Sequence, residues 1–247
     1  MNPNLIKTCK ILIEAYKLGN LGQTVMPEDT NPGLNNMDRE SKLAYFTLPM
    51  SLNYQRDSYK LWEAALKTYR DSNTKEVFNI SWSAQTNSET LRKNLLQYKL
   101  ALQPNKHIHT WQTISKTIND NWGSISELMK ASNNDFLQLK FLVQDKHKKG
   151  FPYLSGAKIF NYWSFIIQQY GGIKLKNSNH IDIAPDTHIT QCSVKLGVIT
   201  KEEAEILSKN EISDRWRSLL TGSKINPIDM HPPLWFWSRN GFTFEIK

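Results

Sequence analysis

Apolar residues recur at helical spacing along most of the chain. After residue 158, apolar side chains occupy positions i, i+3, i+4, i+7, i+8 and i+11 of one stripe that ends before two glycines: Ile159, Tyr162, Trp163, Ile166, Ile167 and Tyr170. This period predicts a helix with one buried face. We find no stretch that alternates apolar and polar residues as a half-buried strand does. The pattern therefore predicts an all-α fold.

The same pattern places the other elements. Residues 22–36 and 71–87 are polar and rich in turn-forming residues, which predicts loops. Ser88 is predicted to be an N-cap, and the two prolines at 232 and 233 are tolerated in the first turn of an amphipathic, aromatic last helix. Further helices are predicted at about 5–16 (closed by Gly19), 39–52, 58–69, 88–102, 111–122, 124–129, 185–197, 201–209, 212–220 and 232–237.

Composition narrows the class of protein. A chain of 247 residues can form one large domain or two small lobes. Its net charge of +8 and isoelectric point near 9.3 suit a polyanionic partner. The two cysteines, Cys9 and Cys192, exclude a disulfide framework and a four-cysteine metal site within one chain. No apolar run approaches the roughly 18 residues of a membrane span, and a secretory signal pattern is absent, so we expect a cytoplasmic monomer.

The sequence contains no motif for a catalytic metal site or for ATP binding. His107 and His109 are two positions apart, and no carboxylate completes a helical pair of metal ligands, so we expect no catalytic metal. A phosphate-binding loop of the GxxxxGK type is missing, so ATP use is not expected either.

The segment from Phe151 to Lys158 predicts a tight turn that leads into a helix. Glycine at 156 lets the backbone approach a phosphate, and the free N–H groups at a helix start attract an anion. Three nearby lysines add positive charge: Lys146, Lys148 and Lys149. The alternative interpretation is an ordinary helical hairpin with a solvated basic face.

Lys158 lies at the first turn of the predicted helix. The positive end of a helix disfavours a charged ammonium, and the neutral amine is the form that attacks carbon and forms a Schiff base. A simple phosphate contact would explain the same position. Asp186, which precedes another predicted helix, has two compatible roles. It is a favoured N-cap residue, and its carboxylate could also stabilise positive charge developing at a sugar C1′.

Three segments together resemble the helix–hairpin–helix base-excision glycosylases, the endonuclease III superfamily. Residues 185–189, Pro-Asp-Thr-His-Ile, followed by Val-Lys-Leu-Gly at 194–197, are similar to the aspartate motif of that family. Residues 151–158 are similar to its hairpin and catalytic lysine, although the hairpin has one extra residue. Residues 51–57 are similar to the segment that inserts Gln or Asn into the duplex. The spacing is closest to that of archaeal 8-oxoguanine glycosylases.

The resemblance implies a two-lobed helical protein with an active cleft between the lobes. Residues 37–170 would form a helical barrel lobe ending in the helix–hairpin–helix, and residues 1–36 plus 171–247 would form the second lobe. Lys158 would be the nucleophile at C1′ and Asp186 its electrostatic partner. A lysine at this position implies a bifunctional enzyme that releases a modified base, 8-oxoguanine being favoured, and then cleaves the strand by β-elimination. No organic cofactor is implied, but a monovalent cation could bind the hairpin carbonyls.

The implied partner is double-stranded DNA with a modified base, in a protein associated with the nucleoid. An enzyme acting at C1′ must extrude the nucleotide and fill the gap. Gln55 or Asn53 is the candidate for that wedge, with Arg56 directed to the orphaned base or a phosphate, unless these residues mark only a polar turn. Aromatic side chains could stack on the extruded base: Trp235, Trp237 and Trp82. The other candidate DNA contacts are Lys148, Lys149, Tyr153, Ser155, Gly156 and His188.

Other functions remain open at this point. In a monofunctional glycosylase for another modified base, Lys158 would only contact DNA. A helix–hairpin–helix protein without catalysis would bind DNA and release no base. A helical protein-interaction module would treat the lysines at 146–149 as a solvated face.

Overall fold

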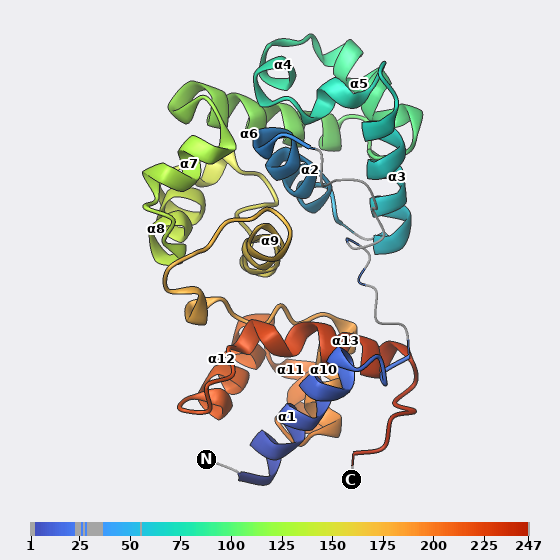
Figure 1. Cartoon of the computed structure of the whole chain (residues 1–247), viewed down its shortest axis with the longest axis vertical. Helices are drawn as coiled ribbons and strands as arrows, with labels where there is room; N and C mark the ends of the chain where they lie inside the picture. Colours follow the sequence, from blue (N-terminus) through green and yellow to red (C-terminus); the bar gives the residue numbers. More distant parts are fainter. Residues whose placement is uncertain (1–2, 23–25, 27, 29–36, 55, 247) are drawn as a thin grey trace. The chain divides into compact units, whose positions relative to one another are not determined.

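The computed structural model describes residues 3–22, 26, 28, 37–54 and 56–246 (Figure 1). Helices and turns make up these segments, and no strand occurs in them apart from one isolated parallel bridge between Asp135 and Lys176. The predicted all-α fold class is confirmed. The chain divides into two compact units: unit 1 comprises Met1–Met26 and Ser178–Lys247, and unit 2 comprises Pro27–Asn177.

Unit 2 is built around α2 (Arg39–Ser51), whose residues 43–51 are all buried. It packs against α3 (Ser58–Arg70), α7 (Ile125–Ala131) and α9 (Ala157–Gln169). Trp163, predicted to be a core residue, is fully buried on α9 and donates from Nε1 to Thr47 Oγ1 at 3.0 Å. The remaining elements are η3 (Lys75–Phe78), α4 (Ile80–Gln85), α5 (Ser88–Gln97), α6 (Lys106–Trp122), α8 (Phe136–Lys140), the π-helix η4 (Phe141–Lys146) and η5 (Lys148–Gly150).

Two local predictions in unit 2 are wrong. The segment 71–87 forms η3 and α4, because the Asn79 side chain caps Trp82 N–H at 3.0 Å and α4 packs its buried residues on α6. The N-cap of α5 is Asn87, one residue before Ser88, and its Oδ1 accepts from Thr90 N–H at 2.8 Å. Both corrections concern side chains that capture the orphan N–H groups of a helix start.

Unit 1 surrounds α13 (His231–Arg239), in which every residue from His231 to Ser238 is buried. It packs on α10 (Thr187–Lys195) and α1 (Pro3–Lys17), and Figure 1 shows these three helices together. A helix buried all round is not amphipathic, so that prediction is wrong, whereas the two prolines do occupy its first turn. The other elements are η6 (Ser178–His180), α11 (Lys201–Ile206), α12 (Lys209–Leu220) and η7 (Pro227–Met230).

Candidate functional site

The turn before α9 has a defined backbone geometry. Ser155 N–H donates to Phe151 O at 2.9 Å, and Gly156 N–H donates to Tyr153 O at 3.0 Å. Tyr153 has a φ of 62°, which is uncommon for a residue with a bulky side chain. Such strain persists only where the surrounding structure enforces it, and it is concentrated at functional sites. Lys158 is the second residue of α9, as the sequence predicts.

The start of α9 is left open. Its N-cap is Gly156, which has no side chain to accept a hydrogen bond, and none of the described residues accepts from the N–H groups of residues 157–159. Most other described helices of the chain begin with a side chain that captures these groups: Asp38, Asp57, Asn79, Asn87, Ser124, Asp135, Asp186, Thr200 and Ser208. An open helix start presents partial positive charge to an anion.

The lysines around this turn are exposed. The side chain of Lys158 makes no hydrogen bond or ion pair with any described residue, and the same holds for the side chains of Lys148 and Lys149. Lys146, at the end of the π-helix, is exposed as well. The region therefore carries several cations that no carboxylate of the described chain neutralises.

The π-helix η4 supports the turn from the preceding side. Gln144 Nε2 donates to Ser155 O at 2.9 Å, which ties η4 to the last part of the turn. At η5, a Cβ added to Gly150 would lie 2.5 Å from Thr117 Oγ1 on α6, so only glycine allows this close approach. π-Helical segments within α-helices are rare and are frequently found at functional sites.

An aromatic and cationic cluster joins the turn to Tyr54. The rings of Tyr54 and Tyr153 lie 5.6 Å apart, and Lys106 Nζ lies 5.3 Å from the first ring centroid and 4.8 Å from the second. Tyr54 is 42% exposed. Sequence reasoning missed Lys106 because only the fold brings the start of α6 to these two tyrosines.

The predicted wedge residues have separate outcomes. Gln55 lies outside the described residues. Asn53 is half-buried, and its N–H donates to Met50 O at 3.3 Å. The Arg56 guanidinium donates to the backbone oxygens of Leu100 at 2.6 Å and Lys99 at 3.0 Å. Burial lowers the pKa of Arg56 to about 10, and these contacts make it an anchor for its own segment.

Asp186 is the N-cap of α10 in unit 1, as predicted. Its Oδ1 accepts from Ile189 N–H at 2.9 Å, whereas Oδ2 accepts no hydrogen bond from a described residue. The side chain is half-buried. Two residues further on, His188 Nδ1 lies 3.0 Å from Ser238 Oγ, and its ring is edge-on to Trp235 at 5.6 Å. The His188 ring is thus tied to α13.

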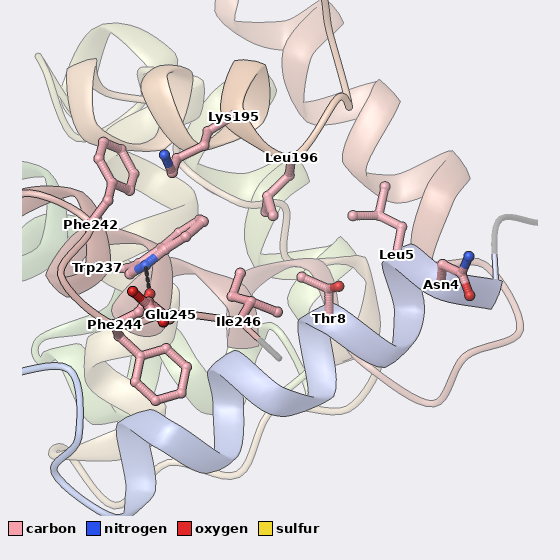
Figure 2. A pocket seen from close by; sticks show the side chains of 10 residues that line it. All are labelled: Asn4, Leu5, Thr8, Lys195, Leu196, Trp237, Phe242, Phe244, Glu245 and Ile246. Carbon is pink, nitrogen blue, oxygen red and sulfur yellow. Dashed lines mark hydrogen bonds between the residues drawn. The ribbon is translucent and has the colours of Figure 1, made fainter.

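The three candidate stacking tryptophans lie in different surroundings. Trp235 is 8% exposed, with the Arg239 guanidinium 4.8 Å from its ring centroid, and Trp237 is 3% exposed. Trp82, on α4 of unit 2, is half-buried. Figure 2 shows Trp237 at a cavity of about 700 Å³ within unit 1, where its Nε1 donates to Phe244 O at 2.9 Å. Phe242 and Lys195 lie against the Trp237 ring, which leaves little of its face open.

The described residues show neither a metal-binding cluster nor a membrane-spanning helix. They contain no group of three or more His, Cys, Asp or Glu side chains that could hold a metal ion. None of the described helices has the length and apolar character required to cross a membrane. No protein-family model matches the chain, and neither does any curated protein.

Proposed function

We propose that the protein is a bifunctional DNA glycosylase and abasic-site lyase that acts on an oxidised or otherwise modified base. The observation that carries the proposal is the open start of α9, where the N–H groups of residues 157–159 donate to no described residue. These groups create a positive potential at the helix start, and the Lys158 side chain, which has no partner among the described residues, begins there. A DNA phosphate is the anion that fits this start, and the lysine beside it is free to act as nucleophile.

Asp186 supports the same chemistry in unit 1. One of its oxygens caps α10, and the other accepts no hydrogen bond from a described residue, so a half-buried negative charge is left over. Such a charge stabilises positive character at C1′ when the glycosidic bond breaks. The proposal requires Lys158 of unit 2 and Asp186 of unit 1 to act on one deoxyribose.

In the proposed reaction, Lys158 replaces the base at C1′. The neutral Lys158 amine forms a bond to C1′ while the C1′–N bond breaks, and the base leaves with the bonding electrons and takes up a proton. Ring opening converts the adduct to a Schiff base. Loss of a proton from C2′ then expels the 3′ phosphate, and water releases the lysine from the unsaturated sugar. The step at C1′ requires the nucleotide to be extruded from the duplex.

A monovalent cation has no part in this proposal. Among the carbonyls of the turn, the oxygens of five residues already accept a hydrogen bond within the described structure: Phe151, Pro152, Tyr153, Ser155 and Gly156. Because a carbonyl oxygen has two lone pairs, these hydrogen bonds do not test the monovalent cation, which stays a prediction.

The test is incubation of the purified protein with duplexes that each carry one modified base, with 8-oxoguanine first, in the presence and absence of borohydride. We expect base release, strand cleavage and a covalent adduct trapped by borohydride, and we expect Lys158→Ala to form no adduct. The matched control is Lys149→Ala, which removes an exposed lysine of the same region and should still be trapped.

The other outcomes separate the alternatives. Base release that survives Lys158→Ala but not Asp186→Asn would identify a monofunctional glycosylase. Salt-dependent DNA binding without release of any base in the panel would identify a DNA-binding protein without catalysis. Absence of DNA binding at low salt would contradict both the proposal and that alternative.

A further inference from the structure

A second cavity in unit 1 has a chemistry that base excision does not use. It has a volume of about 360 Å³ and lies between the end of η6 and the segment that joins α12 to η7. It belongs entirely to residues of unit 1. The described residues that line it are Asn179, His180, Arg217, Leu220, Thr221, Gly222, Lys224, Ile225, Asn226 and Pro227.

The lining is basic. Arg217, Lys224 and His180 are the ionisable groups among the described lining residues, which include no Asp or Glu. Lys224 is exposed and makes no hydrogen bond or ion pair with any described residue. An arginine, a lysine and a histidine that converge on one cavity favour an anion, and a guanidinium matches the oxygens of a phosphate especially well.

Two carboxylates, Asp182 and Asp229, do not line the cavity and accept hydrogen bonds from residues that do. Asp182 Oδ2 accepts from Arg217 Nη2, which fixes the guanidinium. No other hydrogen bond of Arg217 to a described residue occurs, so its remaining N–H groups are available. Asp229 Oδ2 accepts from Asn226 N–H at 3.2 Å at the start of η7. Arg217 is therefore paired with Asp182, whereas Lys224 is a cation of the lining that forms no ion pair with a described residue.

The loop that carries Lys224 is held in an unusual backbone conformation. Gly222 has a φ of 77° and Lys224 a φ of 63°, and a lysine rarely adopts a left-handed conformation. Ile225 N–H donates to Ser223 Oγ at 3.2 Å, which stabilises the turn between these two positions. Lys224 lines the cavity together with its sequence neighbours Gly222 and Ile225, and strain of this kind accompanies binding sites.

Three other residues of the lining are apolar. Leu220 and Pro227 are buried and Ile225 is half-buried. A cavity of this volume is at the lower end of the roughly 300–1,000 Å³ typical for small-molecule sites, so it exceeds the needs of an inorganic anion. We propose that this cavity binds a phosphate ester of mononucleotide size, with the phosphate at Arg217, Lys224 and His180 and the organic part on Leu220, Ile225 and Pro227.

The test is isothermal titration of the full chain with adenosine monophosphate, adenosine and inorganic phosphate. We expect adenosine monophosphate to bind at one saturable site. Because a hydrogen bond to a charged group contributes about 1.5–3 kcal/mol, adenosine should bind at least about tenfold more weakly. Inorganic phosphate should compete for the same site. Absence of saturable binding, or equal affinity for adenosine and its monophosphate, would overturn the proposal.

Substitutions of Lys224 and Lys201 test whether adenosine monophosphate binds in this cavity. Lys224→Glu should weaken adenosine monophosphate binding at least about tenfold, since it replaces an attractive charge by a repulsive one. Lys201→Glu, the same charge change at an exposed position on α11, should leave binding within about twofold. If Lys224→Glu does not fold, Lys224→Gln should show the same ordering. Unchanged binding in both Lys224 variants would disprove the assignment.

The last measurement uses undamaged duplex DNA as a competitor of adenosine monophosphate. If an undamaged duplex displaces adenosine monophosphate and Lys224→Glu weakens DNA binding as much as nucleotide binding, the cavity contacts a nucleic-acid backbone and the proposal is wrong. The cavity shares no residue with the proposed excision chemistry. Base release by Lys224→Glu should therefore equal that of the unaltered protein, and the two proposals can fail independently.

Discussion

The helices α9 and α10 differ in whether a side chain accepts a hydrogen bond from the N–H groups of the first turn. At α10, the Asp186 carboxylate captures Ile189 N–H at 2.9 Å, so the helix begins with a side-chain cap. At α9, Gly156 offers no side chain, and Lys158 follows two residues later. A cap of the first kind contributes about 0.5–2 kcal/mol to stability. The comparison indicates that α9 forgoes this stabilisation, which is expected where the exposed N–H groups have an external anion to bind.

The largest expected effect separates the two roles of Asp186. Asp186→Asn retains a capping oxygen and removes the charge, so base release in single turnover should fall by about 10²–10³-fold while the thermal midpoint stays nearly unchanged. Asp186→Ala removes both, and should lose the same activity together with about 1 kcal/mol of stability. Equal activity of Asp186→Asn and the unaltered protein would mean that Asp186 acts only as the N-cap of α10.

The next effect tests whether the turn before α9 depends on its support. Gly150→Ala should destabilise the protein by about 1–3 kcal/mol in chemical denaturation, because overpacking forces a shift. Its added methyl would meet Thr117 Oγ1 at 2.5 Å and Cγ2 at 2.6 Å. Thr117→Ala in the same chain should restore part of that loss, since it removes both atoms. Additive losses in the double variant would mean that the two sites do not communicate.

A smaller effect converts the open helix start into a capped one. Gly156 has an ordinary φ of −66°, so a side chain is allowed there, although a Cβ would lie 3.1 Å from Tyr153 O. Gly156→Asp should weaken DNA binding about tenfold and reduce its salt dependence, because a carboxylate then occupies the place of the phosphate. Gly156→Asn supplies a cap without charge and should weaken binding less. Identical DNA affinity in both variants and the unaltered protein would show that this start does not contact DNA.

The fold class followed from periodicity wherever a helix buries one stripe. The apolar positions around Trp163 and Ile166 predicted α9 almost completely, since both side chains are fully buried. Helix α4 was missed because it has six residues, and its stability comes from packing on α6 and from the Asn79 cap. The last helix was misjudged for the converse reason: α13 is enclosed on all sides, so its pattern has no polar face to read.

The candidate site was only partly predictable. The positions of Lys158 and Asp186 at helix starts were predicted from recognisable local patterns and agree with the structure, whereas their catalytic roles stay predictions. Lys106 was missed because its contacts with Tyr54 and Tyr153 join three segments far apart in the chain. Tertiary contacts of this kind leave no local pattern.

The smallest expected effect concerns a third helix start, that of α6, and the dependence of protein stability on pH. His107 Nδ1 accepts from Leu102 N–H at 3.1 Å, so the ring is neutral in the folded protein. Burial, with smaller contributions from Arg56 and Lys106, lowers the pKa of His107 to about 4. In the unfolded chain the pKa is close to 6.5.

Stability should therefore fall as the pH decreases from about 6.5 towards 4, because the unfolded chain binds a proton that the folded chain does not. We expect a loss on the order of 1 kcal/mol from this residue. His107→Gln should flatten the dependence in denaturation measured between these pH values. His109→Gln, an exposed histidine of the same helix, should retain it. If both variants behave alike, the acid sensitivity arises elsewhere, and the start of α6 does not depend on a neutral imidazole.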